Sequence, residues 1–173
     1  GTLRLLDQTR LPSEEVIVEA HGYLEAVNAI KTMQVRGAPA IGVTAAYAVA
    51  MAARDLDITD KTAFMQRLEE TGVIIKAARP TAVNLMWAVD RMVGIANSES
   101  DTNSIKQRLL TEAIAMEKED EVINRQMGDH GKDLIPEGGS VLTHCNAGAL
   151  ATAAFGTAVG VIRANWENGK HFS

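Results

Sequence analysis

The stretch Val35-Arg36-Gly37-Ala38-Pro39-Ala40-Ile41-Gly42 separates two predicted helices and marks the sequence as that of a helical domain. Before this stretch, apolar residues recur at helical spacing from Tyr23 to Met33. After it, Pro39 suits the first turn of a helix, where its missing N–H costs nothing. That second helix is predicted to run to about Arg54. Its apolar residues lie on all sides, so we expect it to be buried at the centre of the domain.

The rest of the first 137 residues is predicted to be mainly helical, with a small β element at the N-terminus. Two short apolar runs, Leu3–Leu6 and Val16–Val18, are typical of strands around a turn. Helical spacing and breaks at proline or polar loops predict three further helices. They lie at about Asp60–Ala78, Thr81–Ala96 and Thr102–Leu134, with Gly128 as a candidate break in the last.

A change of pattern after Ile135-Pro136-Glu137-Gly138-Gly139 indicates a domain boundary. Ser140–His144 is predicted to be a strand, Cys145–Gly148 a turn and Ala149–Asn168 a helix, and His171–Ser173 the start of another strand. This order is the opening of a parallel sheet. We therefore predict an α/β protein with a mainly helical domain over residues 1–137 and an incomplete sheet domain over residues 138–173, the rest being outside the chain or on another chain.

Charge and cysteine content exclude several classes of protein. The net charge of −5, without a cluster of lysine and arginine, argues against nucleic-acid binding. A single cysteine excludes an intrachain disulfide within these residues. The longest apolar stretch, Ala38–Ala53, is too short to span a membrane, and Gly1–Arg10 lacks the apolar core of a signal peptide. We expect a soluble, cytoplasmic protein that does not bind a membrane.

Three segments combine a tight turn with a predicted helix start: Arg36-Gly37-Ala38-Pro39, Arg79-Pro80-Thr81 and Cys145-Asn146-Ala147-Gly148. The first turn of a helix offers unpaired N–H donors and a partial positive charge, and a nearby arginine adds a phosphate ligand. Small residues would let a ligand approach the main chain. The alternative interpretation is that both arginines are ordinary surface residues.

Cys145 has two interpretations of its own. Placed between a strand and a helix, its thiol would have a lowered pKa and could react. Alternatively it is a buried cysteine that acts as a small apolar residue. No metal site is indicated, because the four histidines are scattered without ligand spacing. No G-x-G-x-x-G turn follows the predicted strand, so a dinucleotide cofactor is not indicated either.

Taken together and in order, three motifs resemble the methylthioribose-1-phosphate isomerase family over essentially the whole chain. They are Val35–Gly42, Ala78-Arg79-Pro80-Thr81-Ala82-Val83-Asn84-Leu85 and Leu142-Thr143-His144-Cys145-Asn146-Ala147-Gly148, with Leu5-Leu6-Asp7-Gln8 and Gly156-Thr157-Ala158 similar as well. The resemblance implies a helical N-terminal domain followed by a Rossmann-like domain. It also implies a homodimer that needs no metal or cofactor, within a superfamily that includes regulatory subunits of eukaryotic translation initiation factor 2B.

The resemblance also implies a reaction and a site. The family converts 5-methylthioribose 1-phosphate to 5-methylthioribulose 1-phosphate in methionine salvage. By motif match, Arg36, Gly37, Ala38 and Arg79 would bind this sugar phosphate and Cys145 would be catalytic. The family's catalytic aspartate lies beyond residue 173, so we expect the isolated chain to be inactive. A non-catalytic regulatory subunit and a ribose 1,5-bisphosphate isomerase are the alternatives.

Overall fold

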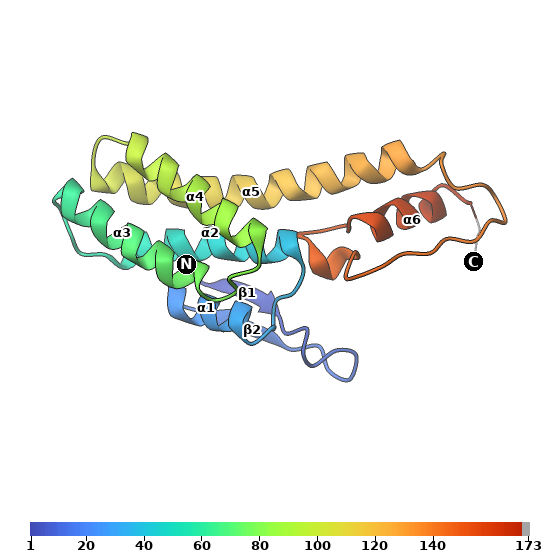
Figure 1. The fold of residues 1–173 in the computed structure, drawn as a ribbon, viewed down its shortest axis with the longest axis horizontal. Helices are drawn as coiled ribbons and strands as arrows, with labels where there is room; N and C mark the ends of the chain where they lie inside the picture. The colour runs from blue at the N-terminus through green and yellow to red at the C-terminus, as the bar shows by residue number, and fades with distance from the viewer. Residues whose placement is uncertain (171–173) are drawn as a thin grey trace.

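The computed structural model describes residues 1–170, which form a helical bundle beside a two-stranded sheet (Figure 1). Strand β1 (Leu3–Leu6) pairs antiparallel with β2 (Ile17–Ala20), with Leu3 opposite Ala20 and Leu6 opposite Ile17. The second strand therefore begins one residue later and ends two residues later than the sequence predicts. Helix α1 (Tyr23–Lys31) follows directly and buries Val27 and Ile30 in the core.

Helix α2 (Ala38–Asp55) is the centre of the bundle, which confirms the predicted central helix. Eleven of its eighteen residues are buried, because α1, α3, α4 and α5 all pack against it. The other bundle helices follow in chain order and confirm the predicted helical domain. They are α3 (Lys61–Lys76), α4 (Val83–Ser98) and α5 (Thr102–Gly131).

Helix α5 is continuous through Gly128, so the candidate break at this residue is wrong. Gly128 serves close packing instead, since a Cβ there would lie 3.1 Å from the Gly160 carbonyl oxygen. Helix α6 (Ala158–Glu167) crosses at this point and packs along the C-terminal half of α5. Figure 1 shows α5 running along the long axis of the molecule, with α6 beside its far end.

The predicted strand at Ser140–His144 is wrong within residues 1–170, where this segment has no strand conformation. A strand is held by the hydrogen bonds of a neighbouring strand, and within residues 1–170 the sheet consists of β1 and β2 alone. The predicted strand at His171–Ser173 lies outside the described residues. The parallel sheet and the domain boundary at residue 137 therefore stay predictions.

The predicted helix Ala149–Asn168 is also wrong in its first half. Only a short 3₁₀ helix, η1 (Ala149–Ala151), forms before α6. Phe155 and Gly156 have φ values of 76° and 99°, which no helix accepts, and Gly156 forms an isolated bridge with Gly148. The loop is closed by the Ala147 carbonyl, which accepts hydrogen bonds from the main-chain N–H groups of residues 157 and 159.

Within residues 1–170, no helix combines the length and apolar character that a bilayer crossing requires.

Candidate functional site

The first turn of α2 has no side-chain cap. Gly37 precedes it with φ 99° and ψ 138°, and as a glycine it has no side chain to cap the free N–H groups. The first turn contains no acidic residue, and Pro39 occupies a position where its missing N–H is not needed. The partial positive charge of this helix end is therefore not balanced by the helix's own side chains.

Gly37 also lies directly against η1, although more than one hundred residues separate them in sequence. A Cβ at position 37 would lie 2.6 Å from the Ala151 carbonyl oxygen. One turn further along α2, a Cβ at Gly42 would lie 3.2 Å from the carbonyl oxygen of Asn84, at the start of α4. The N-terminal end of α2 thus contacts the second motif through Asn84, and it contacts η1, which directly follows the third motif.

Eight of the ten arginines in the sequence form ion pairs with carboxylates within residues 1–170, and the two that do not are Arg36 and Arg79. Both are partly buried rather than fully exposed. A partly buried guanidinium without an anionic partner is costly, unless a ligand supplies the negative charge. This pattern favours an anion site over the alternative of two ordinary surface arginines.

The Arg36 guanidinium is held by the main chain. Its Nη2 donates to the Gln8 carbonyl oxygen at 3.0 Å, while its buried Nε has no hydrogen-bond partner among the described residues. Arg79 lies in the turn before α4, where its carbonyl accepts from the Ala82 N–H at 3.0 Å. No hydrogen bond or ion pair joins these two arginines to each other or to Cys145 within residues 1–170.

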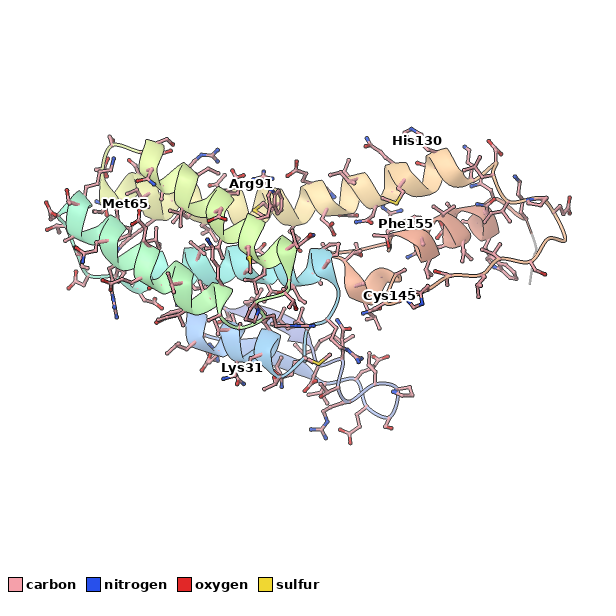
Figure 2. The ribbon with its side chains drawn as sticks, viewed as in Figure 1. Lys31, Met65, Arg91, His130, Cys145 and Phe155 are labelled. Carbon is pink, nitrogen blue, oxygen red and sulfur yellow. The ribbon has the colours of Figure 1, made fainter. Side chains whose placement is uncertain are left out.

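Cys145 is exposed, which rules out the buried interpretation within the described chain (Figure 2). It lies on the extended segment that leads to η1 and has φ 68°, a conformation that costs energy for any residue except glycine. The helix start expected directly behind it is absent: η1 has three residues, and α6 begins only at Ala158. The prediction that a helix begins directly behind Cys145 is therefore wrong.

Asp7 and Gln8 make hydrogen bonds to several segments around the site, and the sequence did not predict this role. The Asp7 carboxylate accepts from the Thr9 hydroxyl at 2.6 Å and from Gln34 Nε2 at 3.1 Å. Chiefly through the bond from the Thr9 hydroxyl, these contacts hold the pKa of Asp7 below its usual value. Gln8 contacts both Arg36 and Leu150. The signal in the sequence was the segment Leu5-Leu6-Asp7-Gln8, which resembles the family but was given no role in the site.

Asp120 ties the same region to α5. Its carboxylate accepts from the Ala153 main-chain N–H at 2.7 Å, two residues beyond η1. Burial raises the pKa of Asp120, and the hydrogen bond from Ala153 opposes that shift. Asp120 thus fixes the loop that follows η1 to the long helix.

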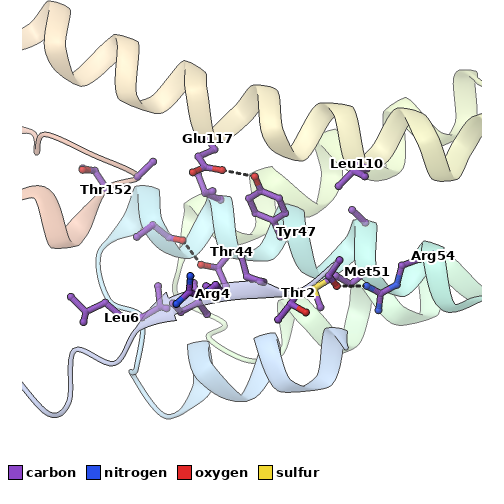
Figure 3. Close-up of a pocket in the computed structure, with 18 of the residues that line it drawn as sticks. Thr2, Arg4, Leu6, Thr44, Tyr47, Met51, Arg54, Leu110, Glu117 and Thr152 are labelled. Atoms are coloured by element: carbon purple, nitrogen blue, oxygen red, sulfur yellow. Dashed lines mark hydrogen bonds between the residues drawn. The ribbon is translucent and has the colours of Figure 1, made fainter. Parts of the chain in front are cut away.

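A pocket of about 710 Å³ lies between β1, α2 and α5, and η1 closes one end of it (Figure 3). Across it, the Tyr47 hydroxyl donates to the Glu117 carboxylate, and burial, followed by this bond, raises the pKa of Tyr47. Gln8, Val35 and Leu150 belong to its lining. None of the five predicted site residues lines it, so the pocket adjoins the motif segments without containing the predicted ligands.

Among residues 1–170, no group of three histidine, cysteine, aspartate or glutamate side chains is placed to hold a metal ion.

Comparison with known proteins gives one family and two sets of relatives. Residues 34–173 match the model of the initiation factor 2 subunit family. The methylthioribose-1-phosphate isomerase of Acetivibrio thermocellus is 53% identical over 99% of this chain, and that of Syntrophotalea carbinolica is 48% identical over 100% of it. The chain spans about half the length of these curated relatives, 51% in each case.

Two solved structures are similar in fold. The 5-methylthioribose 1-phosphate isomerase of Pyrococcus horikoshii has a TM-score of 0.88 at 37% identity, covering 98% of this chain and 48% of its own. A protein described as the delta subunit of translation initiation factor eIF-2B, from A. fulgidus, has a TM-score of 0.85 at 40% identity, covering 98% and 50%. These likenesses extend over the helical bundle and over the three motif segments.

Proposed function

The chain belongs to the initiation factor 2 subunit family, and on that premise we propose that it is the N-terminal half of an aldose–ketose isomerase. The substrate would be 5-methylthioribose 1-phosphate and the product 5-methylthioribulose 1-phosphate, a step of methionine salvage. The similarity to isomerases at 53% and 48% identity over nearly the whole chain supports this assignment. The enzyme would work in the cytoplasm as a homodimer, without a metal or cofactor.

The observation that carries the proposal is that Arg36 and Arg79 form no ion pairs within residues 1–170 and belong to the two motif segments that meet at the start of α2. Arg36 and Arg79 would hold the phosphate of the sugar with their guanidinium groups. The free N–H groups of the first turn of α2 would add main-chain donors, and the absence of a side chain at Gly37 leaves the turn open. Ala38, at the first position of the helix, is small enough for the sugar phosphate to approach the main chain.

The chemistry requires more than phosphate binding. Because the phosphate occupies the anomeric oxygen, the enzyme must open the ring and move hydrogen from C2 to C1. This needs groups that donate and accept protons in a site shielded from water. The exposed thiol of Cys145 is the group in this half that we assign to transition-state stabilisation or proton handling.

One alternative has direct support. The A. fulgidus protein with a TM-score of 0.85 is described as a translation initiation factor subunit, which fits a regulatory protein without catalysis. The three motifs with Arg36, Arg79 and Cys145 favour the isomerase, because a regulatory subunit has no need for these residues together. A ribose 1,5-bisphosphate isomerase would share them and would differ at the far end of the substrate.

The test is an isomerase assay on the full-length polypeptide that carries residues 1–173, and separately on residues 1–173 alone. Formation of the ketose is followed by NMR with 5-methylthioribose 1-phosphate and with ribose 1,5-bisphosphate. We expect turnover of the first substrate by the full-length polypeptide and none by residues 1–173 alone. Turnover of the second substrate only would favour the bisphosphate isomerase, and turnover of neither would favour the regulatory subunit.

Arginine variants test the phosphate assignment within the same assay. Arg36→Ala and Arg79→Ala should raise KM or lower kcat, because each removes a charged donor to the phosphate. Arg67→Ala is the matched control, since Arg67 pairs with Glu70 on the surface of α3. If the two site variants behave like the control, the phosphate site lies elsewhere.

A further inference from the structure

Gln8 is a polar residue that is nearly fully buried, with only 6% of its surface exposed. It follows β1 by two residues and contacts two segments that are far apart in sequence. Its main-chain carbonyl accepts from Arg36 Nη2 at 3.0 Å, and its side-chain Nε2 donates to the Leu150 carbonyl oxygen at 2.7 Å. Its main-chain N–H is also used, donating to the Gln34 carbonyl oxygen at 3.0 Å.

The hydrogen bond to the Leu150 carbonyl determines the orientation of the Gln8 amide. A carbonyl oxygen can only accept a hydrogen bond, so the NH₂ group must face Leu150. The Oε1 atom then points into the protein, where it is buried without a partner among the described residues. An unsatisfied buried acceptor costs stability, and a methionine or leucine would avoid that cost. The amide is therefore suited to a task other than stabilising the fold.

Arg36 shows the same feature on the other side of the contact. Its buried Nε has no partner among the described residues, and the Gln8 carbonyl restricts its Nη2. Gly37 beside it lies against Ala151, the residue after Leu150. One glutamine thus contacts a predicted phosphate ligand with its main chain and the η1 turn with its side chain.

From this arrangement we propose that Gln8 is a positioning residue that fixes the Arg36 guanidinium and the η1 turn relative to each other. The proposal rests on the proposed function, because its task is to set the geometry of the phosphate site. Gln8 does not touch the substrate in this account. It keeps the arginine and the segment that carries Cys145 in one arrangement, and small displacements in such a site are costly to turnover.

The test uses Gln8→Met in the full-length polypeptide, which keeps the length and burial of the side chain and removes the amide. We expect kcat/KM for 5-methylthioribose 1-phosphate to fall by about tenfold or more, with a folded protein by circular dichroism. Gln66→Met, at an exposed glutamine of α3, is the matched control and should leave both constants unchanged. Unchanged kcat and KM in Gln8→Met would overturn the proposal.

A second variant gives a readout that lost stability alone would not produce. In Gln8→Glu, an ionised carboxylate would repel the Leu150 carbonyl, whereas the protonated acid could donate to it. Burial would raise the pKa of the introduced carboxyl group. We expect its activity relative to wild type to recover as pH falls through that pKa. A constant ratio across the pH range would contradict the positioning role.

Hydrogen exchange separates failure of this proposal from failure of the proposed function. In Gln8→Met, the amides of residues 147–152 and 35–38 should exchange faster than in wild type, with no change in α3. This result requires no turnover. A wild type without isomerase activity would refute the proposed function only, while unaltered exchange in both segments would refute the role of Gln8 whether or not the enzyme is active.

Discussion

Gly37 and Ala151 lie so close together that a Cβ on residue 37 would be 2.6 Å from the Ala151 carbonyl oxygen. The φ of 99° at Gly37 independently restricts this position to glycine. Two separate constraints, one from the turn before α2 and one from η1, therefore act on the same residue. The contact joins the arginine motif to the segment that follows Cys145.

Replacing Gly37 with alanine should disrupt this contact. We expect Gly37→Ala to lower the free energy of unfolding of the chain by at least about 2 kcal/mol, since it adds both backbone strain and overlap with main-chain atoms. Urea denaturation measures this directly. Gly94→Ala in α4 is the matched control: nothing lies within 4 Å of its Cβ position, so it should be neutral or should stabilise the helix. Equal effects at the two positions would contradict the close approach.

Replacing Arg36 with lysine keeps the charge and removes the planar donor group. We expect Arg36→Lys to lower kcat/KM of the full-length enzyme by about 10- to 100-fold, because an ammonium group cannot hold the Gln8 carbonyl and a phosphate with the same geometry. Steady-state kinetics at saturating and limiting substrate gives the two constants. Arg67→Lys on the surface of α3 should change neither. A variant with wild-type constants would mean that charge alone is needed at position 36.

Cys145 allows its chemical role to be separated from its backbone strain. We expect Cys145→Ser, Cys145→Ala and Cys145→Gly all to lower kcat by about 100-fold or more, on the scale of losing one transition-state donor. The free energy of unfolding should be about 1 kcal/mol higher for Cys145→Gly than for Cys145→Ala, because glycine accepts φ 68° without strain. Cys145→Ser should not show this gain. Unaltered turnover in Cys145→Ser would remove the thiol from the mechanism.

Asp101 should make the chain sensitive to acid. It caps α5 by accepting from the N–H groups of Asn103 and Ser104, and hydrogen bonds led by that from the Ser104 N–H lower the pKa of Asp101 from 3.8 to about 2. A lowered folded-state pKa gives stability that is present above pH 3.8 and lost as pH falls toward 2. Asn is also a good cap. As pH falls from 3.8 toward 2, the Tm of Asp101→Asn should therefore fall less than the Tm of wild type. Parallel plots of Tm against pH for the two proteins would contradict the lowered pKa of Asp101.

Asp120 should show the opposite dependence. Because burial raises its folded-state pKa above 3.8, the folded chain binds this proton more tightly than the unfolded chain does. The contribution of Asp120 is then most favourable below pH 3.8 and is lost as pH rises through the folded-state pKa. The difference in Tm between wild type and Asp120→Asn should therefore shift in favour of the variant as pH rises through this pKa. Asparagine still offers an oxygen to the Ala153 N–H, so the comparison isolates the charge.

The helices of the bundle were predictable because local signals mark their ends. Pro39 marks the break between α1 and α2, Pro80 marks the break between α3 and α4, and Asp101 caps α5. The segment after residue 137 was not predictable in the same way. Ser140–His144 has the composition of a strand, but a strand requires a partner, and composition carries no information about one. In residues 149–157, the positive φ of Phe155 overrides the helical propensity of the alanines around it.

The site divides in the same manner. Arg36, Gly37, Ala38, Arg79 and Cys145 could be named as candidates from motifs, because each motif is local in sequence, and their roles stay predictions. The contacts that join the motifs could not, since Gln8 and Leu150 are separated by 142 residues and the amide of a glutamine does not reveal its acceptor. The environment of Cys145 was predicted incorrectly for a related reason: the expected helix behind it depended on a loop closed by Gly148 and Gly156.

The two halves of helix α5 pack against different parts of the protein, and this limits insertions and deletions within the helix. Its N-terminal half buries Ile105, Leu109 and Ala113 against the bundle, and its C-terminal half buries Gly128 and Gly131 under α6. Inserting or deleting a single residue between these halves would turn one against the other by about 100°. Related sequences should therefore substitute residues freely on the outer surface of this helix while conserving the number of residues between Ala113 and Gly128.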